Sequence, residues 1–89
     1  MTIARRVRVS GGVQGVGFRA AARAEARRQS LTGWAHNEAD GTVLIAVEGD
    51  ADAVEAFIAW CAQGPVGARV ERVEVTAAKP EGWSGFATG

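Results

Sequence analysis

Several kinds of residue that build special sites are scarce in this chain of 89 residues. It has one cysteine, Cys61, and one histidine, His36, so neither an intrachain disulfide nor a zinc cluster of cysteine and histidine ligands can form. No apolar run approaches the length of a membrane-spanning helix, and the basic N-terminal residues are not followed by the apolar stretch of a signal peptide. We therefore expect a cytoplasmic protein without a metal, another cofactor or a membrane partner.

The chain also lacks a net charge, because ten basic residues balance ten acidic ones. This balance removes any general electrostatic argument for binding nucleic acid. The charges are unevenly distributed: residues 1–30 hold seven arginines and one glutamate, or +6, and residues 31–89 hold three basic and nine acidic residues, or −6. The first third is therefore suited to an anion, although solvated strand and helix faces would explain these arginines equally well.

The chain contains no internal repeat, low-complexity tract or linker, and its length falls below the roughly 150 residues expected of one domain. Its apolar content of 47% and charged content of 22% are typical of a globular protein with a packed core. We expect one domain spanning residues 1–89.

Hydrophobic periodicity predicts the element order βαββαβ. Strands are expected at residues 3–9, 31–37, 42–48 and 70–75 with a short edge piece at 83–86, and helices at 18–29 and from the N-cap Asp50 to Gly64. Two split βαβ units with right-handed crossovers place both helices on one face of an antiparallel sheet. This is the ferredoxin-like α+β sandwich, which many unrelated functions share.

The segment from Gly11 to Arg19, GGVQGVGFR, is the most informative part of the sequence. Its glycines allow positive φ angles, so that successive N–H groups can converge on an anion at the start of the following helix. Arg19 could grip phosphate oxygens with two nitrogens. The alternative is a tight glycine connection beside a solvated arginine.

Two other phosphate loops fit this segment poorly. The Walker-type loop requires a lysine followed by serine or threonine, which the segment lacks. Gly15, Gly17 and Ala20 have the spacing of the dinucleotide fingerprint, with Asp40 in the place of its ribose ligand. However, 89 residues are too few for a doubly wound domain.

The sequence closely resembles the acylphosphatase family over essentially its whole length. The first family signature is matched by Gly11 and by Val13 to Arg19, and the second by Gly33 to Val43, GWAHNEADGTV. Gly12 stands where relatives often carry a basic residue, and Ala35 replaces the valine of the second signature. The resemblance implies a small, metal-independent acid anhydride hydrolase with the βαββαβ order.

The resemblance further implies that Arg19 and Asn37 are the catalytic residues. Arg19 would bind the phosphate of a small acyl phosphate together with the loop Gln14, Gly15, Val16, Gly17 and Phe18, and Asn37 would position the attacking water. The departing carboxylate needs no proton, because its conjugate acid has a pKa of about 4. Phosphoryl transfer through a loose transition state asks mainly for positioning and charge stabilisation.

Neighbouring residues are expected to be structural. His36 should point to the opposite sheet face from Asn37, because consecutive strand residues alternate. The Asp40–Gly41 pair predicts the hairpin turn that sets the position of Asn37. Cys61 belongs to the apolar stripe of a helix, so it is expected in the core. Trp34 is expected to contribute to packing.

The competing hypothesis is a non-catalytic module that binds phosphate or RNA. Aromatic side chains in the central strands would favour RNA, but those strands offer valines and arginines. We therefore expect a monomer that acts on a small-molecule acyl phosphate and binds no nucleic acid.

Overall fold

The computed structural model describes all 89 residues and has the element order that the sequence predicts. The strands are β1 (Thr2–Gly12), β2 (Thr32–Asn37), β3 (Val43–Asp50), β4 (Arg69–Ala78) and β5 (Phe86–Thr88), and the helices are α1 (Phe18–Arg28) and α2 (Ala51–Gln63). Neither helix is long and apolar enough to cross a membrane.

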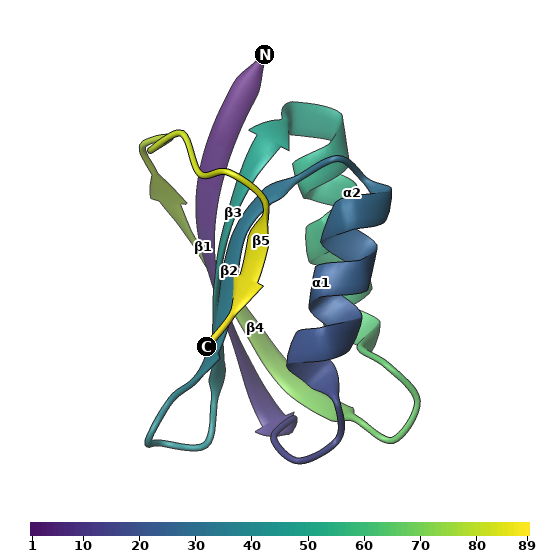
Figure 1. Cartoon of the computed structure of the whole chain (residues 1–89). Coiled ribbons are helices and arrows are strands. Elements are labelled where there is room, and N and C mark those ends of the chain that lie inside the picture. The colour runs from purple at the N-terminus through teal and green to yellow at the C-terminus, as the bar shows by residue number, and fades with distance from the viewer.

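The five strands form one sheet in the order β4-β1-β3-β2-β5, and both helices cover the same face of it (Figure 1). The predicted ferredoxin-like sandwich is therefore confirmed. The β1–β3, β1–β4 and β2–β3 pairs are antiparallel, but β5 runs parallel to β2. The sheet is thus mixed, which corrects the expectation of a purely antiparallel one.

The first strand is longer than predicted, because Gly11 and Gly12 belong to it and not to the loop. They pair with Val70 and Arg69 of β4 after a register shift at Ser10. The φ of Gly11 is 123°, and a Cβ at this position would lie 2.2 Å from the carbonyl oxygen of Arg69. A glycine is therefore required by the close approach of β4, which the local sequence does not reveal.

The last strand begins at Phe86, three residues later than the predicted edge piece. The preceding residues connect β4 at one edge of the sheet to β5 at the other, so they cannot pair as a strand. This connection crosses the face opposite the helices, where Glu48 of β3 accepts hydrogen bonds from the amides of Glu81 and Gly82. Both carboxylate oxygens of Glu48 are thus hydrogen-bonded to this turn, and the residue is only 4% exposed.

The core lies between the sheet and the two helices. Helix α1 contributes residues four apart on one face, and α2 contributes a stripe of similar spacing. The buried helix residues are Phe18, Ala22 and Ala26 from α1, and Val54, Phe57 and Cys61 from α2. They pack on the odd-numbered valines and isoleucine of β1 and β3. The position of Cys61 in this core confirms its structural interpretation, and burial raises the pKa of its thiol to about 12.

Candidate active site

The loop after β1 leads directly into the N-terminus of α1 at one end of the sheet (Figure 1). Val13 is buried and anchors the start of the loop in the core. Gly15 and Gly17 then take left-handed φ angles of 76° and 77°, and a Cβ at either position would contact nothing within 4 Å. These glycines are therefore required by backbone conformation alone.

The amide N–H groups of this loop and of the first helical turn are unpaired within the protein. Gly17 is the N-cap of α1 and has no side chain to cap it, and the first turn contains no acidic residue. The first helical hydrogen bond runs from the amide of Ala21 to the carbonyl of Gly17, and no amide from Gln14 to Ala20 finds an acceptor. Such a set of free donors at a helix N-terminus favours an anion.

Arg19 lies in the first turn of α1 and is half-buried. Its Nη1 donates a hydrogen bond to a main-chain oxygen of Gly89, directly after β5. Because β5 pairs with β2, this contact holds the guanidinium beside the end of β2. The remaining guanidinium donors have no partner in the protein, so they are available to a bound anion.

Asn37 is the last residue of β2, directly before the hairpin between β2 and β3. The amide of Glu38 donates to the carbonyl of Thr42 at 2.9 Å and closes the hairpin. Asp40 accepts hydrogen bonds from both the amide and the hydroxyl of Thr42, at 3.0 and 2.7 Å. These bonds, with Arg8 nearby, hold the pKa of the Asp40 carboxyl below its usual range. The predicted turn at Asp40 and Gly41 is present.

Arg19 and Asn37 line one cavity of about 190 Å³, together with Val13, Gly15, Gly17, Phe18, Ala20 and Thr88. A cavity of this size suits a small anion better than a nucleotide or an organic cofactor. Arg19 is its only ionisable lining residue. Of the predicted loop residues, Gln14 and Val16 are not part of the wall; the Gln14 side chain instead contacts the hairpin.

Sequence reasoning missed three wall residues: Val13 and Ala20, which directly flank the predicted residues, and Thr88 from the other end of the chain. Thr88 reaches the cavity because β5 lies parallel to β2, which places it opposite Ala35. No local pattern around residue 88 signals this, since the placement depends on which strand β5 joins.

The arginines of residues 1–30 do not form one anion-binding surface. Arg19 lines the cavity, whereas Arg6 pairs with Glu81 at 2.9 Å and Arg28 with Glu25 at 2.5 Å. Arg8 lies 3.5 Å from Asp40. The excess positive charge of this segment is thus partly balanced by acidic residues from the rest of the chain. No group of three or more histidine, cysteine, aspartate or glutamate side chains comes together that could hold a metal ion.

The sheet face opposite the helices carries an aromatic pair on β2. Trp34 and His36 stack with ring centroids 4.3 Å apart, and the guanidinium of Arg6 lies 5.4 Å from the centroid of the Trp34 ring. His36 is therefore on the other face from the cavity, as predicted from strand alternation. The central strands β1 and β3 present Arg6, Arg8 and aliphatic residues there, not aromatic ones.

The fold is a ferredoxin-like α+β sandwich with a small cavity, lined by Arg19 and Asn37, at one end of the sheet. Comparisons with known proteins identify the family. Residues 5–88 match the family model described as Acylphosphatase. An acylphosphatase of Thermococcus kodakarensis is 52% identical over 80 residues, covering 90% of this chain and 88% of the relative.

Solved structures agree with these matches. An acylphosphatase from Bacillus subtilis superposes with a TM-score of 0.95 at 36% identity, covering 100% of this chain and 99% of that one. One from Coxiella burnetii gives a TM-score of 0.95 at 34% identity, with 99% and 93% covered. The chain belongs to the acylphosphatase family, and it is a hydrolase of the acylphosphatase type.

Proposed function

We propose that the chain hydrolyses the carboxyl–phosphate bond of small acyl phosphates, using Arg19 and the loop amides to hold the phosphate and Asn37 to hold the attacking water. The observation that carries this proposal is that Arg19, Asn37 and a run of unpaired amides meet at one cavity of small-anion size. The three contributions come from α1, β2 and the loop after β1, which the fold brings to one end of the sheet.

The loop amides and Arg19 supply the charge stabilisation that the reaction needs. In a loose transition state, negative charge is spread over the three equatorial oxygens of the transferred phosphoryl group. Preorganised N–H donors and a guanidinium stabilise this charge without having to reorganise. Because these groups neutralise the phosphate themselves, the proposed reaction requires no metal ion.

Asn37 places the nucleophile. Its side-chain carbonyl oxygen can accept a hydrogen bond from a water molecule in line with the departing oxygen. The bond from this water to phosphorus forms as the bond from phosphorus to the acyl oxygen breaks, and the proton of the water passes to the phosphate. The carboxylate leaves unprotonated, since its conjugate acid has a pKa of about 4. This matches a cavity wall that contains no carboxyl, histidine, cysteine or lysine side chain.

We further propose that residues 1–89 act as one domain, as a monomer, in the cytoplasm. The proposed site draws all its residues from a single chain. The one cysteine is buried and unpaired, so the fold needs no oxidising compartment.

The proposal is tested by phosphate release from benzoyl phosphate in the presence of a chelator, with a phosphate monoester and ATP as controls. We expect Arg19→Ala to lower turnover by about 100-fold or more and to abolish competition by inorganic phosphate, as loss of one strong transition-state donor does. Asn37→Ala should lower turnover while inorganic phosphate still competes.

The matched control is Arg23→Ala, which removes the same charge one turn further along α1 from an exposed position away from the cavity. This variant should retain wild-type turnover. Equal losses of turnover in Arg19→Ala and Arg23→Ala would mean that Arg19 acts only through its positive charge and not through direct contact with the phosphate. Comparable hydrolysis of ATP or the monoester would contradict the leaving-group argument.

A further inference from the structure

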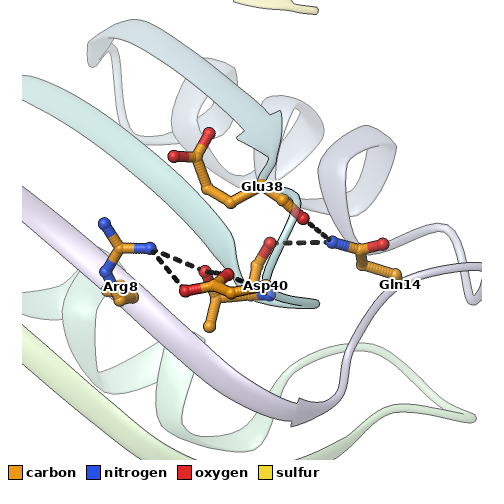
Figure 2. Close-up of polar contacts among 5 residues, drawn as sticks. Arg8, Gln14, Glu38 and Asp40 are labelled. Carbon is orange, nitrogen blue, oxygen red and sulfur yellow. Dashed lines mark hydrogen bonds and ion pairs between the residues drawn. The ribbon is translucent and has the colours of Figure 1, made fainter.

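The hairpin that carries Asn37 is held between two side chains from outside it. Figure 2 shows Gln14 reaching the hairpin from the glycine loop and Arg8 reaching it from β1 on the other side. Neither residue lines the cavity. The hairpin is therefore tied to both elements that border it.

The Gln14 amide nitrogen donates to two carbonyl oxygens, those of Glu38 at 2.8 Å and Thr42 at 2.9 Å. Because both partners are acceptors, only the nitrogen of this amide can face them. The same two carbonyls close the hairpin, since they also accept from the amides of Gly41 and Glu38 respectively. Gln14 thus binds the neck of the hairpin, where β2 ends at Asn37.

The glycine loop has little else to fix its position against the hairpin. Between Val13 and the first helical bond of Ala21, its backbone makes no hydrogen bond to the protein. Gly15 and Gly17 add conformational freedom. The Gln14 side chain is the hydrogen-bonded link that runs directly from this loop to the segment next to Asn37.

The other side of the hairpin is held by a second set of side-chain hydrogen bonds. Arg8 Nη1 donates to the Thr42 hydroxyl at 2.7 Å, and that hydroxyl donates to Asp40. The link from Gln14 therefore ends on a turn that is itself bonded to β1 through Arg8.

We infer that Gln14 is a positioning residue for hydrolysis: its side-chain amide sets the distance and angle between the phosphate held by the loop and the water held by Asn37. This inference rests on the proposed function. A positioning role differs from a purely structural one in its expected effect. Phosphate binding uses the loop and Arg19, whereas in-line attack also depends on the hairpin, so turnover and phosphate affinity should respond differently.

The test is Gln14→Met, which keeps the length of the side chain and removes both donors. We expect turnover at saturating benzoyl phosphate to fall by about ten- to a hundredfold, the loss typical of a reacting group displaced by about 1 Å. The inhibition constant of inorganic phosphate should stay close to the wild-type value. Gln14→Lys, whose ammonium can donate to both carbonyls, should recover part of the lost turnover.

Asp50→Ala serves as a control for lost stability. Asp50 caps α2 at the end of β3 away from the hairpin, so this variant is destabilised without touching the site. It should keep wild-type turnover at a temperature where both variants are folded. Thermal unfolding measured for both variants shows whether stability explains any difference between them.

A second readout does not depend on hydrolysis. Titration of inorganic phosphate into isotope-labelled wild-type protein should shift the NMR signals of the loop amides and of the Asn37 side-chain amide. In Gln14→Met the loop signals should still shift, and the Asn37 signal should shift much less. The inference would be overturned if Gln14→Met kept the wild-type turnover or the wild-type shift of the Asn37 signal. It would also be overturned if this variant lost turnover and phosphate affinity equally. A wild-type protein that fails to hydrolyse benzoyl phosphate would instead overturn the proposed function.

Discussion

At the scale of single residues, the glycines of the two family signatures are needed for different physical reasons. Gly15 and Gly17 have open space around them, so they serve the conformation of the loop. Gly33 lies within β2, and a Cβ there would lie 1.8 Å from the carbonyl oxygen of Ala46 on β3. Its φ of 144° is also unfavourable for other residues. Gly33, like Gly11 of the first signature, is therefore required by the packing of the sheet, whereas Gly15 and Gly17 are required by the conformation of the loop.

Replacing Gly33 with alanine should be strongly destabilising. The new Cβ would push β2 away from β3, so we expect a loss of about 4 kcal/mol or more in the free energy of unfolding, at the upper end for single substitutions. Denaturant unfolding followed by circular dichroism measures this loss.

Gly67→Ala is the matched control, because φ at Gly67 is also positive, at 93°, but no atom lies within 4 Å of the added Cβ. It should cost only the strain of the left-handed conformation, about 1 to 2 kcal/mol. Similar losses at both positions would show that the contact with Ala46 is not the cause.

At the scale of elements, the two helices differ at their N-termini. Helix α2 is capped by Asp50, whose carboxylate accepts from the amide of Asp52 at 3.2 Å. Helix α1 begins at Phe18, and its N-cap residue, Gly17, has no side chain that could cap it. A capping side chain would occupy the same amides that the proposed function assigns to the phosphate, so under that proposal α1 forgoes the stabilisation of a cap.

The cap of α2 should therefore contribute to stability and not to turnover. We expect Asp50→Ala to lower the free energy of unfolding by about 1 kcal/mol. In a domain of this size that loss corresponds to a fall of about 4 to 8 °C in Tm. Asp50→Asn keeps an accepting oxygen and should remain close to wild type. A marked loss of stability in Asp50→Asn would assign the effect to the charge of Asp50 instead of its hydrogen bond.

At the scale of the whole molecule, one core supports the fold and holds its only thiol. Cys61 packs beneath the sheet, and its pKa of about 12 keeps the thiol protonated at neutral pH. In the unfolded chain this thiol has a pKa of about 8.5. Because the unfolded state loses the proton first, stability should decrease as the pH rises above about 8.5.

Labelling of Cys61 should consequently report global unfolding. We expect Ellman's reagent to react slowly with the native protein and rapidly once denaturant has unfolded it, with a midpoint equal to that seen by circular dichroism. A cysteine introduced at exposed Ser84 should react at once in native buffer. Fast native labelling of Cys61 would mean that α2 opens locally.

Much of this architecture could be predicted from the sequence, because its signals are local. Period-two alternation in residues 3–9 and 42–48, the Asp50 cap and the Asp40–Gly41 turn each depend on a few neighbouring residues, and all appear in the structure. The opposite orientations of His36 and Asn37 also follow from strand geometry alone.

The rest depends on which strands become neighbours. The parallel placement of β5, which brings Thr88 to the cavity wall and Gly89 to Arg19, has no signal near residues 86–89. The same is true of Gly11, which only the approach of β4 explains.

The sequence by itself determined the elements, their order and the residue types offered for chemistry, since propensity, capping and turn formation act over a few residues. Only the tertiary structure decided that Gly89 lies against Arg19, and that Gln14 turns to the hairpin instead of the cavity. The physical reason is that these contacts join residues 24 to 70 positions apart. Such contacts form only when the complete sheet brings separate segments to one end.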